Sequence, residues 1–408
     1  MSSQDRTRMA LVIVLVLAIV VAAGGTGFAA GWFLSPRIPL APAASASQAD
    51  LQQRFQLFWE AWSVIDREFN RDGPIDLQKA VYGAISGAVQ SLGDPYTAFS
   101  PPAQAKILAQ DLEGCFEGIG ATVDLVDGLL TVVQPLEGSP AFKAGLLSND
   151  VVLEVDGTPL KGMDLTQAIA LIRGPKGSQV RLLIRREGMA EPFEVVLTRE
   201  RIDLPTVSYH MLDDGIAYVR LAEFNSQATV RLQAALGELM RNEPRALIFD
   251  LRGNPGGYLH IAVQVASQFM RDGLVVTEKD SQGEITEYRV DGKGLALDVP
   301  LVVLVDGGSA SASEIVAGAL QDTGRATLIG RTTFGKGCVQ ATYTLSDGSA
   351  VRVTIARWYT PKGRQLDSGG LEPDIAVSPD TESTETTQDP VLERAREFIL
   401  SPQPATTP

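Results

Sequence analysis

Three serines and one lysine have the residue types that acyl-transfer chemistry requires. Ser309, Ser311 and Ser313 alternate within a stretch of glycine and alanine, and Lys336 follows between two glycines. A serine hydroxyl at a helix start meets the positive end of the helix dipole, where nearby amides can stabilise a developing oxyanion. Burial makes a lysine lose its proton more readily, so that its neutral amine can accept the serine proton. The spacing leaves open which of the three serines would be the nucleophile.

The same residues also have a purely structural interpretation. Ser311 and Glu314 have the spacing of a capping box, in which both side chains satisfy free amides at a helix start. A Gly-Lys-Gly sequence around Lys336 is typical of an exposed turn. The two histidines, His210 and His260, do not mark a Ser-His-Asp arrangement. A serine-lysine site and an inert helix cap beside a solvated lysine therefore both remain open.

A second small-residue turn follows the apolar run 246–249. Residues 250–257 read Asp-Leu-Arg-Gly-Asn-Pro-Gly-Gly, and glycine permits the close approach and unusual φ angles that let backbone N–H groups point at an anion. Sites in open α/β sheets gather where strands end and loops lead into helices. This turn and the serine-rich turn are both candidate sites.

The elements that must position these turns alternate between strands and helices. Apolar strands are expected at 216–221, 246–249 and 301–305, and helices at 228–240, 259–270 and 312–320. This alternation favours a largely parallel α/β core over residues 202–378. A β-hairpin is expected over 339–345 and 350–357, joined around Asp347-Gly348.

The regions on either side of this core differ in character. Short β runs separated by glycine indicate a small β-rich module over residues 112–201, with a helix at 164–172. Residues 51–111 form a helical region, with amphipathic helices at 51–69 and 77–92. The aromatic stripe of the first helix is typical of core packing. The segment 379–408 is predicted to be an acidic flexible tail that is helical only over 391–400.

The N-terminus indicates export. Arg6 and Arg8 precede an apolar run over residues 9–34 that is long enough to span a bilayer, which predicts a transmembrane anchor. The positive charge before the run favours a single-pass protein of the cell membrane, with the body on the extracytoplasmic side. The Pro-, Ala- and Ser-rich residues 35–50 form a linker. Residues 44–46 (Ala-Ser-Ala) leave open a cleaved signal and a secreted product.

Composition excludes several classes of function. The net charge of −14, with no basic run in the 408 residues, argues against nucleic acid as a partner. The scattered histidines and cysteines lack metal-ligand spacing, so no metal site is expected. Cys115 and Cys338 could form a disulfide in an exported protein, but two small buried thiols are favoured.

Together these motifs resemble those of the C-terminal processing peptidases, the tail-specific serine proteases of family S41 that carry a PDZ domain. Residues 308–323 and 333–341 resemble the nucleophile and base segments of that family, and 250–257 resemble its oxyanion segment; 358–361 and 370–374 are also family-like. The likeness extends over about residues 51–378. It implies a crotonase-like (ClpP/crotonase-type) α/β protease core with an inserted PDZ domain over 112–201, an N-terminal helical segment and a transmembrane helix.

The resemblance also implies roles for individual residues. Ser311 falls on the nucleophile, Lys336 on the general base, and Gln340 on the residue that orients the lysine. The oxyanion donors would be the backbone N–H groups of Gly257 and Ala312, with Gly256 as the alternative to Gly257. No metal or organic cofactor is implied.

Within the PDZ domain, the resemblance implies a loop that caps the terminal carboxylate of a bound peptide, formed by Gly118, Ile119, Gly120 and Ala121. The peptide would add as a strand to a sheet edge. Arg173 matches a loop that reports ligand binding to the active site, although an ordinary exposed turn residue is the simpler interpretation. The implied partners are proteins with apolar C-termini, and a homo-oligomer is compatible with the sequence.

One position departs from the family pattern. Cys338 stands where a small hydroxyl residue is more usual, which suggests a hypothesis of redox sensitivity. Two further functions are compatible with parts of the sequence: a catalytically silent PDZ scaffold at the membrane and a serine hydrolase of small esters. The joint presence of Ser311, Lys336 and Gln340 favours an active peptidase over a scaffold, and the PDZ-like module favours it over an esterase.

Overall fold

A six-stranded, mostly parallel sheet forms the centre of the C-terminal half of the chain. The computed structural model describes residues 48–71, 73–367, 369–377 and 389–401, divided between a unit that ends at Leu77 and one that begins at Gln78. The strand order is β10-β11-β12-β15-β16-β19. The strands are β10 (Val207–Met211), β11 (Ile216–Leu221), β12 (Ala246–Asp250), β15 (Leu301–Val305), β16 (Thr327–Gly330) and β19 (Ile375–Ala376). Only β10 runs antiparallel to its neighbour, which confirms the predicted parallel core.

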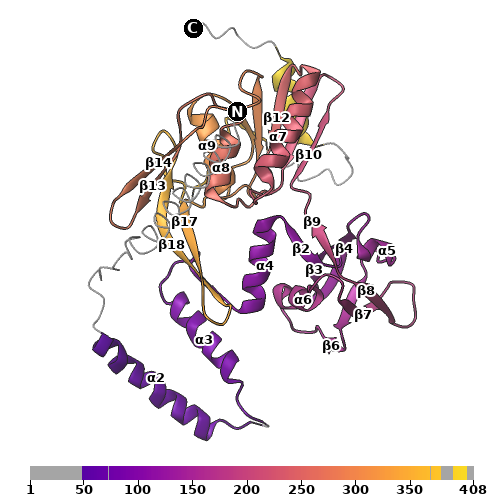
Figure 1. Cartoon of the computed structure of the whole chain (residues 1–408), viewed down its shortest axis with the longest axis vertical. Helices are drawn as coiled ribbons and strands as arrows, with labels where there is room; N and C mark the ends of the chain where they lie inside the picture. The colour runs from indigo at the N-terminus through magenta and orange to yellow at the C-terminus, as the bar shows by residue number, and fades with distance from the viewer. Residues whose placement is uncertain (1–47, 72, 368, 378–388, 402–408) are drawn as a thin grey trace, which may run out of the picture. The chain divides into compact units, whose positions relative to one another are not determined.

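Helices cover both faces of this sheet (Figure 1). Successive side chains of a strand point to opposite faces, so Leu247 and Phe249 pack on one side and Ile248 on the other. The first side holds α7 (Ala228–Leu239), α8 (Leu259–Ala266) and α9 (Ala312–Asp322). The second side holds α10 (Pro390–Leu400). The loops after β12 and β15 therefore lead into α8 and α9 at one edge of the sheet.

The C-terminal helix α10 corrects one sequence-based expectation. The prediction of a helix near 391–400 is confirmed, but this part of the segment is not a loose tail. Ala395 is fully buried, and Val391, Leu392, Phe398 and Ile399 pack with it against the sheet. These residues recur at helical spacing, which produces one apolar face among acidic neighbours. The acidic composition of the segment concealed this face.

A second, antiparallel sheet lies beside the serine-lysine region. Its strand order is β1-β18-β13-β14, and β17 also pairs with β18. The strands are β1 (Ala98–Ser100), β13 (Leu274–Asp280), β14 (Ile285–Arg289), β17 (Cys338–Thr344) and β18 (Ala350–Tyr359). The pair β17–β18 is the predicted hairpin. The helices α3 (Leu77–Gln90) and α4 (Pro102–Glu113) flank β1 in the sequence.

The β-rich module is a sheet of order β3-β4-β5-β7-β8, with β3 at one edge and β6 pairing with β5. Its strands are β3 (Ala121–Val126), β4 (Leu129–Pro135), β5 (Val151–Val155), β6 (Thr158–Pro159), β7 (Gln179–Arg185) and β8 (Phe193–Thr198). Its helices are α5 (Pro140–Lys143) and α6 (Leu165–Ile172). The chain enters and leaves the module through the antiparallel pair β2 (Cys115–Gly118) and β9 (Glu200–Asp203).

The first unit contains the helix α2 (Gln48–Glu68). Its aromatic stripe was expected to pack in a core, but Trp59 is 61% exposed and Phe55 and Phe69 are also exposed. In the described part of this unit, residues 48–71 and 73–77, no second layer lies against which this helix could bury an apolar face. The predicted anchor at 9–34 lies outside the described residues. Among the helices that the structure describes, none is long and apolar enough to cross a membrane.

Candidate active site

Ser311 occupies a strained turn immediately before α9. Its backbone has φ +54° and ψ −112°, a conformation that costs a residue with a side chain about 1–3 kcal/mol. This turn is held against residues 250–257 at the end of β12, which we call the glycine turn. A Cβ atom added to Gly256 would lie 2.8 Å from Ser311 Cβ and 3.0 Å from the Ala312 nitrogen. The two candidate turns of the sequence therefore meet at Ser311.

Hydrogen bonds distinguish Ser311 from the two neighbouring serines. The buried Ser309 hydroxyl donates to the Leu251 carbonyl at 2.8 Å, and the buried Ser313 hydroxyl donates to the Asn254 carbonyl at 2.8 Å. Both hydroxyls hold the glycine turn in place. Ser311 is half-buried and lines a cavity. Of these three serines, Ser311 is therefore the one whose side chain borders the cavity and is not committed to a carbonyl of the glycine turn.

The glycine turn offers an N–H group beside Ser311. The Gly256 N–H donates to Asn254 Oδ1 at 2.9 Å, so it is already committed. Gly257 has φ +143°, and a Cβ there would lie 2.3 Å from the Phe224 carbonyl oxygen, so only glycine fits. In the described part of the chain the Gly257 N–H makes no hydrogen bond. This geometry favours Gly257 over Gly256 as the free donor.

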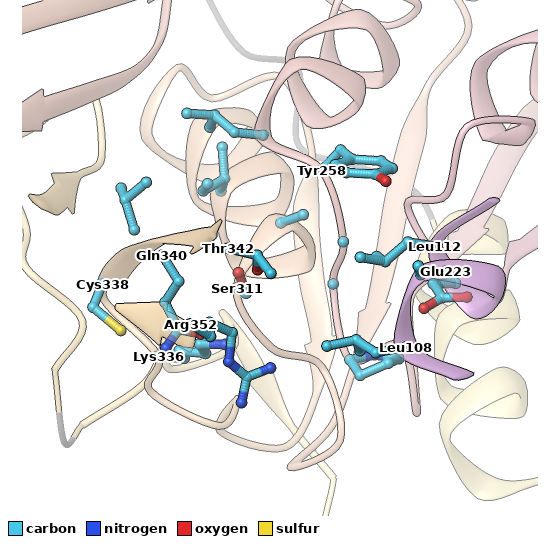
Figure 2. A pocket seen from close by; sticks show the side chains of 18 of the residues that line it. Leu108, Leu112, Glu223, Tyr258, Ser311, Lys336, Cys338, Gln340, Thr342 and Arg352 are labelled. Carbon is cyan, nitrogen blue, oxygen red and sulfur yellow. The ribbon is translucent and has the colours of Figure 1, made fainter. Parts of the chain in front are cut away.

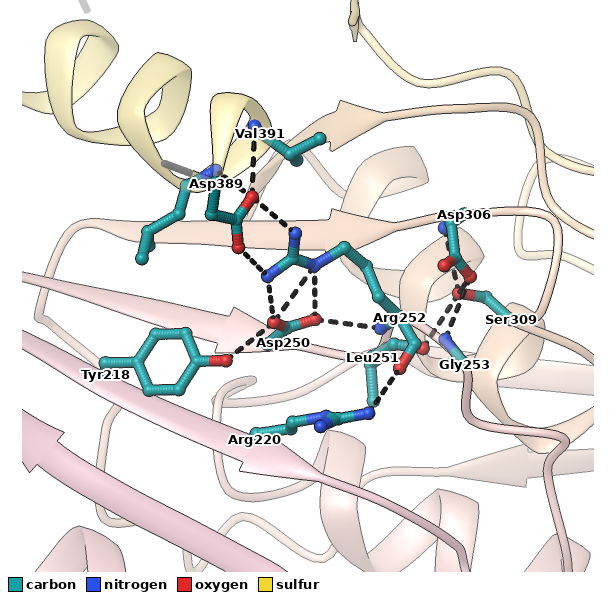
Figure 3. A network of polar contacts seen from close by, with 11 residues as sticks. Tyr218, Arg220, Asp250, Leu251, Arg252, Gly253, Asp306, Ser309, Asp389 and Val391 are labelled. Carbon is teal, nitrogen blue, oxygen red and sulfur yellow. Dashed lines mark hydrogen bonds and ion pairs between the residues drawn. The ribbon is translucent and has the colours of Figure 1, made fainter. Parts of the chain in front are cut away.

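A polar network connects this turn to α10 (Figure 3). Arg252 pairs with Asp250 at the end of β12 and, at 2.8 Å, with Asp389 before α10. Asp389 also accepts from the first amides of that helix. Next to Arg252, the Gly253 N–H donates to Asp306 Oδ1 at 2.9 Å. The start of the glycine turn is therefore fixed both to the beginning of α10 and to the loop after the neighbouring strand β15.

Glu314 connects the serine turn to the lysine segment. This fully buried carboxylate accepts from the Ser311 N–H at 2.8 Å, and from the Lys336 N–H at 3.0 Å. It also accepts from the Thr333 hydroxyl at 2.6 Å and the Gly335 N–H at 2.8 Å. The Glu314 half of the capping box that the spacing suggested is present, since Glu314 accepts from the Ser311 N–H, and the glutamate also positions the candidate base.

Lys336 is half-buried rather than exposed, which rules out the solvated-turn interpretation. Burial, with the Arg352 guanidinium as a second cause, holds the pKa of Lys336 below its ordinary value. Its amine lies 5.4 Å from the centre of the Tyr96 ring. Gln340 donates a hydrogen bond from its side chain to the Tyr96 carbonyl. Gln340 therefore contacts the residue that borders Lys336.

One cavity of about 680 Å³ brings the predicted catalytic residues together (Figure 2). It is lined by Ser311, Lys336, Gln340, Gly257 and Ala312. Its walls are largely apolar, and one wall is the helix α4, through Ala105, Leu108, Ala109 and Leu112. The predicted helical region 51–111 covers nearly all of this helix, but its bounds were not predicted, although these four residues have the i, i+3, i+4, i+7 spacing of an amphipathic helix. Glu223 and Arg352 also line the cavity, and no sequence motif singled them out.

Arg173 joins the β-rich module to this wall. Its guanidinium lies 4.2 Å from the centre of the Phe116 ring and bonds to Asp111 of α4 at 2.9 Å. Arg173 is half-buried, so it is not an ordinary exposed turn residue. A Cβ on Gly118 would lie 3.6 Å from Arg173 Cγ. The predicted carboxylate loop and the wall of the cavity are thus linked through one side chain.

The rest of the predicted loop directly precedes the edge strand β3. Gly120 has φ +72°, and its carbonyl accepts from the Ser139 hydroxyl at 2.7 Å. Ile119 is buried in the core of the module, and Ala121 begins β3. An edge strand has unpaired backbone groups to which an extended peptide can add.

The two cysteines, Cys115 and Cys338, are free thiols. Burial raises the pKa of Cys338, which disfavours the reactive thiolate.

Comparison with known proteins agrees with this geometry. The model of peptidase family S41 matches residues 215–377, and a PDZ domain model matches residues 131–186. The chain is 36% identical over 356 residues to the carboxy-terminal-processing protease of Bartonella bacilliformis, covering 86% of this chain and 81% of that protein. The chain belongs to peptidase family S41. Its members are serine-type peptidases, as the resemblance predicted.

Two further relatives support this assignment. This S41 peptidase is 36% identical over 331 residues to the carboxy-terminal processing protease CtpA of Bacillus subtilis, covering 81% of the chain and 70% of CtpA. The solved photosystem II D1 C-terminal processing protease superposes with a TM-score of 0.50 at 34% identity, covering 80% of this chain and 93% of that one. The S41 peptidase fold with a PDZ domain is therefore established for this chain.

Proposed function

We propose that this S41 peptidase is an endopeptidase that cuts proteins near their C-termini with Ser311 as nucleophile and Lys336 as general base. One observation carries the proposal. Ser311 and Lys336 line the same cavity, whereas the hydroxyls of Ser309 and Ser313 are buried in hydrogen bonds. The printed names of the relatives, which are C-terminal processing proteases, support the same reaction.

The proposed mechanism follows from the positions of these groups. Ser311 Oγ attacks the scissile carbonyl while the neutral Lys336 amine takes its proton. The N–H groups of Gly257 and Ala312 stabilise the oxyanion of the tetrahedral intermediate. Lys336 then returns the proton to the leaving amine, and an ester remains on Ser311. A water molecule, deprotonated by Lys336, hydrolyses this ester and releases the new C-terminus.

The lowered pKa of Lys336 supports its role as base, because more of the amine is neutral near pH 7. Gln340 supports this role through Tyr96, whose carbonyl accepts its side-chain N–H. Glu314 positions the backbone of both Ser311 and Lys336. In this proposal the two sheets and their helices form a core of the crotonase type.

The PDZ domain is proposed to select the substrate. The C-terminal residues of an apolar tail would add to β3, and residues 118–121 would cap the terminal carboxylate. The Arg173–Asp111 pair supports a coupling of PDZ occupancy to the wall formed by α4. We further propose an extracytoplasmic location at the cell membrane with residues 9–34 as anchor, supported by Arg6 and Arg8 ahead of the apolar run.

The test compares the full-length chain in mild detergent with Ser311→Ala and Lys336→Ala, using an unfolded protein with an apolar C-terminus as substrate. Each variant should lower kcat by about a thousandfold or more. The control variants Ser208→Ala and Lys362→Ala remove an exposed serine and an exposed lysine and should cleave normally. Cleavage by Ser311→Ala would exclude this nucleophile, and an inactive wild type would favour the silent scaffold.

A further inference from the structure

Arg352 presents an unpaired guanidinium to the cavity that contains Ser311 and Lys336 (Figure 2). Its Nε atom is buried and has no hydrogen-bond partner. Arg357 on the same strand pairs with Asp367, whereas within the described residues no carboxylate forms an ion pair with Arg352. An arginine side chain stays protonated in proteins. The cavity therefore contains a permanent positive charge without a counter-ion.

The backbone around Arg352 fixes the position of this charge. Arg352 lies in β18 with Ala98 of β1 as its partner on one side and Thr342 of β17 on the other. Strands on both sides prevent the backbone from moving away from the cavity. Because apolar side chains such as Leu108 and Ile315 line the same space, the unpaired charge costs free energy until an anion binds it.

Glu223 also lines the cavity, but it does not neutralise Arg352. Burial and the nearby Asp111 raise the pKa of Glu223 to about 7. A carboxyl group in contact with a guanidinium would instead have a lowered pKa. Figure 2 shows Glu223 beside Leu112, whereas Arg352 lies beside Lys336. Arg352 therefore has no carboxylate partner among the described residues, and a bound molecule can supply one.

The proposed chemistry indicates which part of a substrate reaches Arg352. Lys336 returns its proton to the leaving amine, so the segment after the scissile bond must pass Lys336. Arg352 and Lys336 line the same cavity, and Figure 2 shows them side by side. The group that meets Arg352 therefore belongs to the leaving segment, which ends in the substrate's own C-terminus.

We propose that Arg352 is a specificity-determining residue that binds a carboxylate on the leaving segment of the substrate. The carboxylate is the terminal one of a short tail or that of an Asp or Glu side chain near the cut. This site is distinct from the carboxylate loop of the PDZ domain at residues 118–121. The inference rests on the proposed Ser311–Lys336 peptidase. It adds that this peptidase prefers substrates with a carboxylate in the segment after the scissile bond.

The test uses short peptides with two, three or four residues after the scissile bond, each ending in a free acid or an amide. An excess of a second, uncleaved peptide with an apolar C-terminus keeps the PDZ domain occupied throughout. A second series is fully amidated and carries Glu or Gln at each position after the bond. The ratio of kcat/KM between matched peptides is measured, because any general loss of base strength cancels in this ratio.

In wild type, at least one matched pair should favour the carboxylate by about 10- to 100-fold, the range of a charge-assisted hydrogen bond. Arg352→Gln should bring this ratio to about one, and Arg352→Lys should retain part of it. Arg289→Gln, which removes an exposed arginine from the same sheet, should leave the ratio unchanged. The series that responds identifies the terminal or the side-chain carboxylate as the ligand.

Two results would overturn the inference: ratios near one in wild type for both series, or ratios that Arg352→Gln leaves intact. Binding of the same peptides to Ser311→Ala should show the same preference without turnover, which separates recognition from catalysis. If wild type cleaves the carboxylate and the amide peptides of each pair equally well, the proposed carboxylate site is wrong, but the proposed peptidase function is not contradicted. If wild type cleaves no peptide and Ser311→Ala shows no preference in binding, both are wrong.

Discussion

Replacing Glu314 with glutamine should weaken the connection between the Ser311 turn and the Lys336 segment while keeping the size of the side chain. The carboxylate accepts four hydrogen bonds, from Ser311, Thr333, Gly335 and Lys336, and it is fully buried. An amide has one oxygen and one NH2 group in the same positions. In either orientation its NH2 group must face at least one backbone N–H.

The magnitude follows from these contacts. In the better orientation the NH2 group faces Thr333 and Gly335, and the amide oxygen keeps Ser311 and Lys336. One charge-assisted hydrogen bond of about 1.5–3 kcal/mol is lost, and the two retained bonds weaken to about 0.5–1.5 kcal/mol each. The total loss of stability is then about 3–6 kcal/mol. Because the lost contact is in the Lys336 segment, kcat should fall further than unfolding alone explains.

Urea unfolding followed by circular dichroism gives the stability, and peptide cleavage under conditions where each variant is folded gives kcat. Thr333→Val is the matched control, since it removes one donor to Glu314 and leaves the Glu314 side chain itself unchanged. It should cost less than Glu314→Gln in both assays. If Glu314→Gln unfolds within 1 kcal/mol of wild type and keeps kcat within twofold, the role assigned to Glu314 is refuted.

Three further predictions concern charges around the site. Asp389→Asn should lower stability to urea by about 1 kcal/mol, because a partly exposed ion pair is lost while asparagine still caps α10, and Asp389→Ala should cost about 1 kcal/mol more. In the proposed mechanism Lys336 acts only when it is neutral, so kcat/KM should rise with pH, and the midpoint of this rise should lie below the ordinary lysine value of about 10.4. Arg352→Gln should raise this midpoint, since it removes a cation that disfavours the ammonium form; an unchanged pH profile would contradict this. Arg173→Gln and Asp111→Asn should each bring the ratio of cleavage rates with and without a PDZ ligand toward one, and a ratio equal to that of wild type would exclude the coupling.

The parallel core and the hairpin could be predicted because hydrophobic periodicity and turn residues are local features. The choice of Ser311 could not, since Ser309, Ser311 and Ser313 have the same residue type and spacing. What distinguishes them is burial against the Leu251 and Asn254 carbonyls, about 60 residues away in sequence. The resemblance to the family motif, by contrast, indicates Ser311 from the sequence alone.

The residues that sequence reasoning missed act through distant partners. Glu314 was interpreted as a helix cap, because its local partner Ser311 is visible in the sequence and its partners at 333–336 are not. In the sequence Arg352 is one basic residue of an alternating strand, and its proposed role depends on the cavity that it lines. The apolar face of α10 is visible in its helical spacing, but the acidic composition of the segment favours a flexible tail.

The strand β1 has a consequence for how the protein is made. Residues 98–100 pair with residues 350–352, and the whole PDZ domain and most of the core lie between them in sequence. Closing so long a loop is entropically costly and must precede completion of the sheet that contains Arg352. A nascent chain therefore cannot complete the cavity that contains Ser311 and Lys336 until nearly the whole chain has been synthesised. This order of assembly would keep the emerging protease inactive toward its own unfolded segments.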